Sequence, residues 1–368
     1  MLSPHQLRRY SRHLLFPYVG IHGQQRLRQA RVLVVGCGGL GSPILLYLAA
    51  AGIGTLGIID GDSVEESNLQ RQILYGVSSL RKSKVEQTTQ RLQDLNPEVT
   101  IEPYSEMLTS QNALTIFEKY DLIIDGSDNF PTRYLVNDAC VLLQKPFIYG
   151  AIYRFEGQVA IFNYQGSPTY RDLFPTPPPP DLAPNCAEAG VLGVLPGIVG
   201  SIQASEALKL ILNIGQPLIG KLFLIDALTL TTRIVQIPRL AVPPVIEGLI
   251  DYEEFCGVKS AGVREISPEK LFEIKSLGID FQLIDVRQPD EYQRDNLEGL
   301  LIPLAQLEER VGEIRQQGVV VVHCHSGSRS QKAIQYLKEK YGFDHLQNLT
   351  GGIVSYRKWE RQNQSSIL

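Results

Sequence analysis

The stretch RVLVVGCGGLGSPILLYLAAAG, residues 31–52, decides the fold of the first part of the chain. An apolar run, which predicts a buried strand, leads into a glycine-rich loop, and a second apolar run predicts the helix that follows. The loop glycines are Gly36, Gly38, Gly39 and Gly41. Glycines permit a tight turn here, and they let backbone N–H groups approach phosphates at the N-terminus of the helix. This arrangement predicts a nucleotide site in an α/β fold.

The next predicted strand carries an acid at its end. The string LGIID, residues 56–60, predicts a strand that ends in Asp60, nineteen residues after Gly41. An acid at this position suits a ribose hydroxyl. Taken alone, the two strands and their glycine loop predict a bound nucleotide, with NAD as the default ligand.

The 368-residue chain has an ordinary composition, with 43% hydrophobic and 20% charged residues and a net charge of −4. Its length allows two domains with separate cores, and its acidic balance argues against a nucleic-acid surface. Five cysteines without a C-x-x-C pair indicate a reducing compartment. Because the N-terminus also lacks an apolar signal core, we expect a cytoplasmic protein. The uncharged stretch 32–59 is long enough for a membrane span, but its glycines break it into short elements, so we expect no membrane segment.

Changes in the strand and helix pattern along the sequence predict the domain boundaries. Strand and helix patterns alternate from residue 31 to about residue 239, interrupted by the proline-rich stretch 167–185, which cannot be the interior of a helix or strand. A segment without periodicity follows, and a new strand-helix pattern begins near Ile266. We therefore predict a nucleotide-binding domain over 1–240, a linker over 241–265 and a second, smaller α/β domain over 266–368.

The residues after the second strand favour a nucleoside triphosphate over NAD. The strings DSVEESNLQRQILY (62–75) and RKSKVE (81–86) place Asn68, Arg71 and Lys84 where they could converge on phosphates. A triphosphate needs such cations, because its charge must be neutralised before a nucleophile can attack.

A further predicted strand, in YDLIIDGSDNFPTRY (120–134), ends at Asp125, Asp128 and Asn129, where a carboxylate could hold Mg²⁺ between phosphates. The alternative is that these are solvated charges on loops.

Residues 1 to about 240 closely resemble the MoeB/ThiF family, through the strings GCGGLG, SNLQRQ, KVE and DGSDNF. The resemblance implies a Rossmann-like domain that uses ATP to adenylate the C-terminal carboxylate of a small ubiquitin-like sulfur carrier protein. By motif, the residues implied to contact the nucleotide, its phosphates or its Mg²⁺ are Gly36, Gly38, Gly39, Gly41, Asp60, Ser67, Asn68, Arg71, Lys84, Asp128 (which would organise the Mg²⁺) and Asn129.

The resemblance also concerns the opening stretch LRRYSRHLLF (7–16), which predicts an amphipathic helix with a basic face. In the family, the arginine that matches Arg12 reaches into the ATP site of the partner subunit. The resemblance therefore implies a homodimer with two composite sites.

The string HCHSGSRS, residues 323–330, predicts a reactive cysteine near the C-terminus. Cys324 ends an apolar strand, Arg329 lies five positions later, and a helix is predicted over 330–341. Such a loop aims backbone N–H groups at the sulfur and stabilises an anion, which makes the thiol a nucleophile. The loop is one residue shorter than that of tyrosine phosphatases, so its cradle suits one extra sulfur atom better than a phosphate. The alternative is an inert cysteine that packs at a strand end.

The upstream string LIDVRQPDEY (283–292) places Asp285 and Arg287 at another strand end. The two stretches together resemble a rhodanese domain, in which the strand-end cysteine carries a persulfide. The segment DNLEGLLIP (295–303) departs from the family's usual turn.

The two resemblances together imply one reaction sequence. Adenylation turns a carboxylate into an electrophile, and a persulfide on Cys324 is a suitable nucleophile. Cys186, at a predicted helix start where the dipole favours a thiolate, is the candidate second thiol that releases the carrier thiocarboxylate. A sulfur donor such as a cysteine desulfurase would load Cys324.

Two other function classes remain at this point: an NAD-dependent oxidoreductase with a sulfur-binding module, and a non-catalytic adaptor for a ubiquitin-like protein. The carrier also stays open between molybdopterin synthesis, thiamin synthesis and tRNA thiolation.

Members of the family commonly hold a structural zinc with two C-x-x-C pairs, and this chain lacks those ligands. The first pair's positions are Thr169 and Asp172, and no cysteine or histidine occurs between Cys186 and Cys256. Because a tetrahedral zinc site needs four ligands, usually thiolates or imidazoles, we predict a zinc-free protein whose stability strong chelators leave unchanged. Metal analysis that finds stoichiometric zinc, lost together with the fold on chelation, would contradict this prediction.

Overall fold

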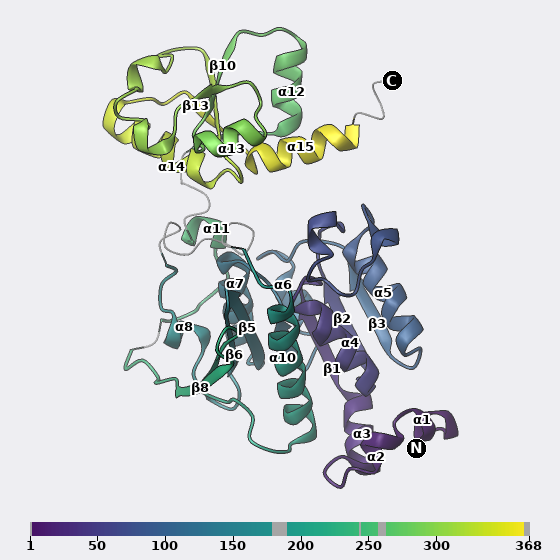
Figure 1. Ribbon diagram of the computed structural model, residues 1–368. Coiled ribbons are helices and arrows are strands. Elements are labelled where there is room, and N and C mark those ends of the chain that lie inside the picture. The colour runs from purple at the N-terminus through teal and green to yellow at the C-terminus, as the bar shows by residue number, and fades with distance from the viewer. Residues whose placement is uncertain (1, 179–189, 243, 257–262, 364–368) are drawn as a thin grey trace. The chain divides into compact units, whose positions relative to one another are not determined.

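The computed structural model describes residues 2–178, 190–242, 244–256 and 263–363. The chain divides into two compact units, residues 1–255 and 256–368 (Figure 1). Both units are α/β, so the fold class predicted from the sequence, a Rossmann-like domain with a smaller second α/β domain, is confirmed. Cys186 lies outside the described residues.

The first unit is built on an eight-stranded sheet. Its strands are β1 (Arg31–Val35), β2 (Thr55–Ile59), β3 (Thr100–Tyr104), β4 (Leu122–Asp125), β5 (Phe147–Tyr153), β6 (Glu156–Phe162), β7 (Lys221–Asp226) and β8 (Thr231–Gln236). Their order is β3-β2-β1-β4-β5-β6-β7-β8. The first five strands in this order are parallel, whereas β6, β7 and β8 each run antiparallel to the strand before them. The strand order reverses between β1 and β4, and α/β sheets bind ligands at such a point.

Two groups of helices pack against this sheet. The helices are α1 (Pro4–Arg9), α2 (Ser11–Leu14), α3 (Gly20–Gln29), α4 (Gly41–Ala51), α5 (Lys84–Leu95), α6 (Ala113–Phe117), α7 (Phe130–Leu142), α8 (Tyr170–Leu173), α10 (Val194–Leu212) and α11 (Tyr252–Phe255), with the short 3-10 helices η1 (Glu66–Asn68) and η2 (Val77–Ser79). α4 contacts α5 and α10, whereas α6 contacts α7, and α7 lies against β4 and β5 (Figure 1). The core between them is formed by buried aliphatic residues of β1, β2, β4 and α4.

The predicted glycine turn joins β1 to α4. Gly36 has a φ of +91°, in the left-handed region that favours glycine. A Cβ on Gly41 would lie 2.0 Å from the carbonyl oxygen of Gly36, so only glycine fits at residue 41. The helix therefore starts directly above the carboxyl end of β1, with its free N–H groups at the edge of the sheet.

The N-terminal segment differs from its prediction. The sequence predicted one helix over 7–16, but the structure has two separate helices, α1 and α2, and the helical backbone is interrupted at Tyr10. Tyr10 is buried, its ring packs against Gly52, and its hydroxyl accepts a hydrogen bond of 2.9 Å from Asn96 Nδ2. Burial of this aromatic ring in the core is favourable, and it outweighs the local preference for one continuous helix.

Of the described helices, α10 is long and apolar enough to cross a membrane by length and composition alone. It packs against α4, β5 and β6 as a central helix of the first unit. Gln203 from this helix donates a 2.7 Å hydrogen bond to the backbone oxygen of Asp125 in β4. A Cβ on Gly150 would lie 2.3 Å from the Gln203 side chain, so this glycine in β5 lets α10 approach the sheet.

Asp172 joins α8 to the end of the first unit. One carboxylate oxygen accepts hydrogen bonds from the backbone N–H and hydroxyl of Thr169, at 2.8 and 3.0 Å. The other oxygen accepts a 2.9 Å hydrogen bond from the backbone N–H of Leu240. Thr169 and Asp172, the positions of the family's first zinc pair, thus form a helix cap. Among the described residues, no group of three or more His, Cys, Asp and Glu side chains could hold a metal ion, and the zinc-free state stays a prediction.

A buried ion pair fixes the last helix of this unit. Arg171 makes two hydrogen bonds, of 2.8 and 2.7 Å, to the carboxylate of Asp138 in α7. The Tyr252 hydroxyl donates a 2.8 Å hydrogen bond to the same carboxylate, and the Arg171 guanidinium lies 4.8 Å from the centre of the Phe255 ring. Because every partner of this buried charge is satisfied, the cluster ties α11 to α7 and α8.

The second unit has a five-stranded parallel sheet. Its strands are β9 (Arg264–Ile266), β10 (Phe281–Asp285), β11 (Leu300–Leu301), β12 (Val319–His323) and β13 (Leu346–Leu349), in the order β11-β10-β12-β13-β9. Its helices are α12 (Pro268–Ser276), α13 (Pro289–Arg294), α14 (Ser328–Tyr341) and α15 (Gly352–Asn363), with 3-10 turns η3 (Leu304–Gln306) and η4 (Val311–Glu313). β12 and α14 correspond to the strand and helix predicted around Cys324. The loop between them sits at the carboxyl end of the central strand.

Candidate functional site

The carboxyl ends of β1, β2 and β4 meet at one edge of the first sheet, because these strands are parallel. Asp60 at the end of β2 accepts 2.8 Å hydrogen bonds from the backbone N–H groups of Cys37 and Asp62, one on each carboxylate oxygen. Burial raises the pKa of Asp60, and these hydrogen bonds oppose that shift. The side chain predicted to bind a ribose therefore also fixes the glycine loop to the neighbouring strand.

Lys84 lies among three carboxylates at this edge. Its side chain is 8% exposed, and its ammonium forms a 2.9 Å ion pair with Asp62. Burial opposes the charge, but Asp60, Asp62 and Asp128 outweigh it, so the pKa of Lys84 is raised. The structure thus brings Lys84 close to Asp60 and Asp128, the two residues that the sequence assigns to the ribose and to Mg²⁺. Asp62 was missed, although an acid two residues after a strand end is the signal that could have identified it.

Arg71 reaches the glycine loop. Its Cγ lies 3.6 Å from the position that a Cβ on Gly39 would take, and its Nη1 donates a 3.1 Å hydrogen bond to the backbone oxygen of Ser67. Asn68 accepts a 3.1 Å hydrogen bond from the Glu65 N–H and approaches the Ser67 hydroxyl at 3.5 Å. The segment around η1 therefore brings the predicted phosphate ligand Arg71 to the loop, while Ser67 and Asn68 make contacts within that segment.

The residues that follow β4 have different roles in the fold. Asp125 is fully buried, accepts a 2.9 Å hydrogen bond from the Ser127 N–H, and has a pKa raised by burial. Asp128 is exposed at the edge of the sheet. Asn129 caps α7 by accepting a 2.9 Å hydrogen bond from the Thr132 N–H, so this predicted nucleotide ligand already has a structural task.

Arg12 does not lie at the glycine loop of its own chain. It sits on α2, exposed, where the neighbouring Tyr10 packs against Gly52 at the C-terminal end of α4. The glycine loop is at the N-terminal end of the same eleven-residue helix, which spans about 16 Å. Figure 1 shows α1 and α2 beyond the end of α4, next to α3.

Cys324 in the second unit is the acceptor of a small hydrogen-bonded loop. The thiol is fully buried, and its sulfur accepts a hydrogen bond of 3.1 Å from the backbone N–H of Gly327, the N-cap of α14. The Ser330 hydroxyl lies 3.5 Å from the same sulfur and 2.6 Å from Asn348 Oδ1. The hydroxyl has one proton, which it can direct either to the sulfur or to the amide oxygen.

Arg329 points to α13. Its two terminal nitrogens form a bidentate ion pair with Glu291, with both N–O distances 2.7 Å. Hydrogen bonding to Arg329 lowers the pKa of Glu291 to about 2. The expected cradle around the sulfur is therefore made by the backbone N–H of Gly327 and the Ser330 hydroxyl, and Arg329 fixes the outside of the loop.

A buried polar group lies beneath this loop. Asp285 and Arg287 form a fully buried ion pair at 2.7 Å, and Arg287 also donates to the backbone oxygen of Asp295 at 2.6 Å. The neighbouring His323 is fully buried with its Nε2 3.6 Å from Asp285, and neither ring nitrogen has a hydrogen-bond partner among the described residues. Burial lowers the pKa of His323 to about 4, so the imidazole is neutral at pH 7.

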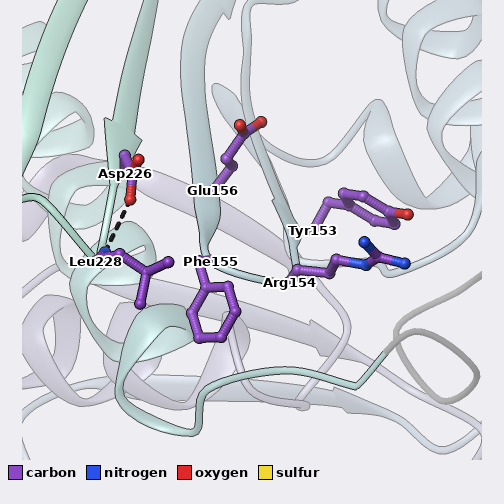
Figure 2. A pocket seen from close by; sticks show the side chains of 6 residues that line it. All are labelled: Tyr153, Arg154, Phe155, Glu156, Asp226 and Leu228. Carbon is purple, nitrogen blue, oxygen red and sulfur yellow. Dashed lines mark hydrogen bonds between the residues drawn. The ribbon is translucent and has the colours of Figure 1, made fainter.

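A surface pocket of about 260 Å³ lies elsewhere on the first unit (Figure 2). It is lined by Tyr153, Arg154, Phe155, Glu156, Asp226 and Leu228. These residues come from the turn between β5 and β6 and from the end of β7, and Asp226 accepts a 2.8 Å hydrogen bond from the Leu228 N–H. None of the predicted site residues lines this pocket.

Both units match known families. Residues 10–243 match the ThiF family, and residues 271–358 match the rhodanese-like domain. The resemblance predicted from the two sets of motifs is therefore confirmed.

Curated proteins are similar to the whole chain or to its first unit. The probable adenylyltransferase/sulfurtransferase MoeZ of Mycobacterium tuberculosis is 44% identical over 381 residues, which cover 100% of this chain and 96% of that protein. The sulfur carrier protein adenylyltransferase of Thermus thermophilus is 53% identical over 265 residues, which cover 69% of this chain and 98% of that protein.

Solved structures share the fold of the first unit. E. coli MccB with ATP superposes with a TM-score of 0.57 at 22% identity, covering 66% of this chain and 75% of that chain. PaaA gives a TM-score of 0.56 at 26% identity, covering 65% and 76%. MccB, at this low identity, shows the fold alone.

His323 predicts a pH dependence of the second unit. Its pKa is about 4 in the folded state and near 6.5 when unfolded, so the unfolded state binds the proton more tightly. Stability is therefore full above pH 6.5 and falls by roughly 3 kcal/mol as the pH drops to 4. The fluorescence of Trp359, the chain's single tryptophan, reports this unit during urea unfolding.

The control separates His323 from other titrating groups. His323→Gln should flatten the pH slope relative to the wild-type protein, whereas His345→Gln, at a partly exposed histidine of the same unit, should keep it. An unchanged slope in His323→Gln would show that another group carries the dependence.

Proposed function

The chain is an adenylyltransferase and sulfurtransferase of the ThiF family with a rhodanese-like domain, and we propose that its substrate is a small ubiquitin-like sulfur carrier protein. In this proposal, the enzyme adenylates the C-terminal carboxylate of the carrier and then converts that carboxylate into a thiocarboxylate. The observation that carries this proposal is the meeting of Lys84, Arg71 and the glycine loop at one edge of the sheet. Two cations beside a helix N-terminus suit a polyphosphate. The name of the Thermus relative supports a sulfur carrier protein as the substrate.

In the first step, a carboxylate oxygen of the carrier attacks the α-phosphorus of ATP. The bond to the bridging oxygen breaks, pyrophosphate leaves, and a mixed anhydride of the carrier with AMP remains. Lys84 and Arg71 would stabilise the negative charge that builds on the leaving pyrophosphate. Lys84 forms an ion pair with Asp62, so a bound triphosphate would compete with this carboxylate for the lysine.

Asp128 is the residue that would hold Mg²⁺. It is exposed at the edge of the sheet, and Mg²⁺ is commonly bound by one or two carboxylates together with substrate phosphates. The ion would supply charge neutralisation of the phosphates. This donor set fits such a site, because the remaining ligands would come from the nucleotide and water.

In the second step, the terminal sulfur of a persulfide on Cys324 attacks the acyl carbon, AMP leaves, and an acyl disulfide forms. A second thiol then attacks the Cys324 sulfur, which releases the thiocarboxylate and leaves a protein disulfide. Cys186 is proposed for this thiol, a cellular thiol would reduce the disulfide, and a donor such as a cysteine desulfurase would reload Cys324. The N–H of Gly327 and the Ser330 hydroxyl would stabilise the anionic sulfur.

We also propose a homodimer in which Arg12 acts on the partner's nucleotide. The distance of α2 from its own glycine loop supports action in trans. The same helical segment exposes large apolar side chains that a second subunit could cover, among them Leu15, Phe16, Tyr18 and Ile21. A cytoplasmic location is part of the same proposal, and any of the three carrier pathways named above is compatible with this chemistry.

Activation and sulfur transfer should be separable, because their residues lie in different units. Lys84→Ala should lower carrier-dependent ATP–pyrophosphate exchange about 100-fold or more, since it removes a cation from the developing charge. Lys82→Ala, at an exposed lysine two residues away, is the matched control and should leave exchange unchanged.

Cys324→Ser should keep exchange and abolish the thiocarboxylate, which intact mass detects as the replacement of one carrier oxygen by sulfur. A normal thiocarboxylate yield from Cys324→Ser would exclude the persulfide role.

Mixed dimers test the trans arrangement. Subunits with Arg12→Ala and subunits with Arg71→Ala should each be inactive in exchange alone, because each lacks one arginine in every composite site. In a heterodimer of the two, one site would regain both arginines, so exchange should return with one working site per dimer. If purified heterodimers stay inactive, Arg12 acts within its own chain or not at all.

A further inference from the structure

Arg133 in α7 is a buried cation without a hydrogen-bonding partner. The residue is 7% exposed, and its guanidinium makes no hydrogen bond or ion pair with any of the described residues. Its contacts are with aromatic faces, at 5.3 Å from the Phe130 ring centre and 5.8 Å from the Tyr149 ring centre. A buried charge without polar partners is costly, and native proteins retain one mainly where function needs it.

Other unsatisfied polar atoms surround Arg133. Asp125 Oδ2, the Tyr170 hydroxyl and Arg133 Nε are all buried without a hydrogen-bond partner in the described part of the chain. Asp125 and Tyr170 influence the charge of Arg133, yet no ion pair within 4.0 Å joins Arg133 to Asp125. The guanidinium is therefore close to an acid but free to bind another anion.

This group lies next to the proposed nucleotide site. α7 starts at Phe130, shortly after the end of β4, and Arg133 lies in its first turn, five residues after Asp128. Tyr149 belongs to β5, on the side of β4 that faces away from β1 and its glycine loop. The polyphosphate cations Lys84 and Arg71 lie on the β1 side, so Arg133 is separated from them by β4.

We propose that Arg133 binds the C-terminal carboxylate of the carrier protein and holds it at the end of β4 for adenylation. This inference rests on the proposed function and names the residue that receives the nucleophile. A guanidinium fork matches a carboxylate with two parallel hydrogen bonds. The aromatic rings of Phe130 and Tyr149 beside this single cation suit the one carboxylate of a chain end better than a triphosphate, whose charge needs several cations. Binding of the tail would supply the partner that Arg133 lacks.

The test compares two forms of one sulfur carrier protein, one with a free C-terminal carboxylate and one with a C-terminal amide. Titration calorimetry without ATP measures the affinity of each form, since no chemistry then occurs. The wild-type enzyme should bind the carboxylate form about 10- to 100-fold more tightly, the usual range for a charged hydrogen bond. Arg133→Gln should reduce this preference to near unity and leave ATP affinity unchanged. Arg133→Lys, which keeps the charge but loses the fork, should give an intermediate preference.

The controls separate binding from folding and from the proposed function. Arg91→Gln, at an exposed arginine of α5 that pairs with Asp94, should keep the full preference. If Arg133→Gln does not fold, Arg133→Lys carries the same comparison. Equal binding of both carrier forms by the wild-type enzyme, or an unchanged preference in the folded Arg133 variants, would overturn the inference. Pyrophosphate exchange by the wild-type enzyme tests the proposed function independently, so the two can fail separately.

Discussion

The close contact between Gly36 and Gly41 is the constraint on which the first unit depends. The carbonyl oxygen of Gly36 occupies the space that a side chain on Gly41 would need, so the short glycine loop between β1 and α4 can turn this tightly. The helix N-terminus is thereby held at the carboxyl edge of the sheet, and Asp60 locks the turn through the Cys37 N–H. Every proposed phosphate ligand is placed relative to this one turn.

Much of this edge was predictable from the sequence, because parallel strands bring their following residues to one place. Glycines, Asp60 and Lys84 could be found by motif and spacing alone. Asp62 was missed although its place just after a strand end was a usable signal, whereas the importance of Arg133 comes from its burial and its surroundings and could not be found in this way. The break at Tyr10 was also hidden, because it depends on Asn96 and Gly52, far along the chain. Periodicity reports local preference, whereas these features arise from tertiary contacts.

The second unit shows the same division between local and distant information. The strand, the reactive cysteine and the following helix were predicted from one short string. The direction of Arg329 was not, because its partner Glu291 lies on another helix. Nor did the sequence indicate that the His323 ring would be neutral, with no partner for either ring nitrogen among the described residues, beside a buried ion pair. The sulfur thus contacts a backbone N–H and a hydroxyl, while Arg329 pairs with Glu291.

The hydrogen bonds of Asp172 have a consequence for the chemistry that this protein is proposed to carry. They join α8 to the end of the first unit through oxygen and nitrogen atoms, at Thr169 and Leu240. Thiolates attack the sulfur–sulfur bond of persulfides and are oxidised by oxidants, whereas carboxylate hydrogen bonds take part in neither reaction. The proposed persulfide chemistry therefore leaves these hydrogen bonds intact. Oxidants would inactivate the Cys324 thiol before they disrupted the contacts of Asp172.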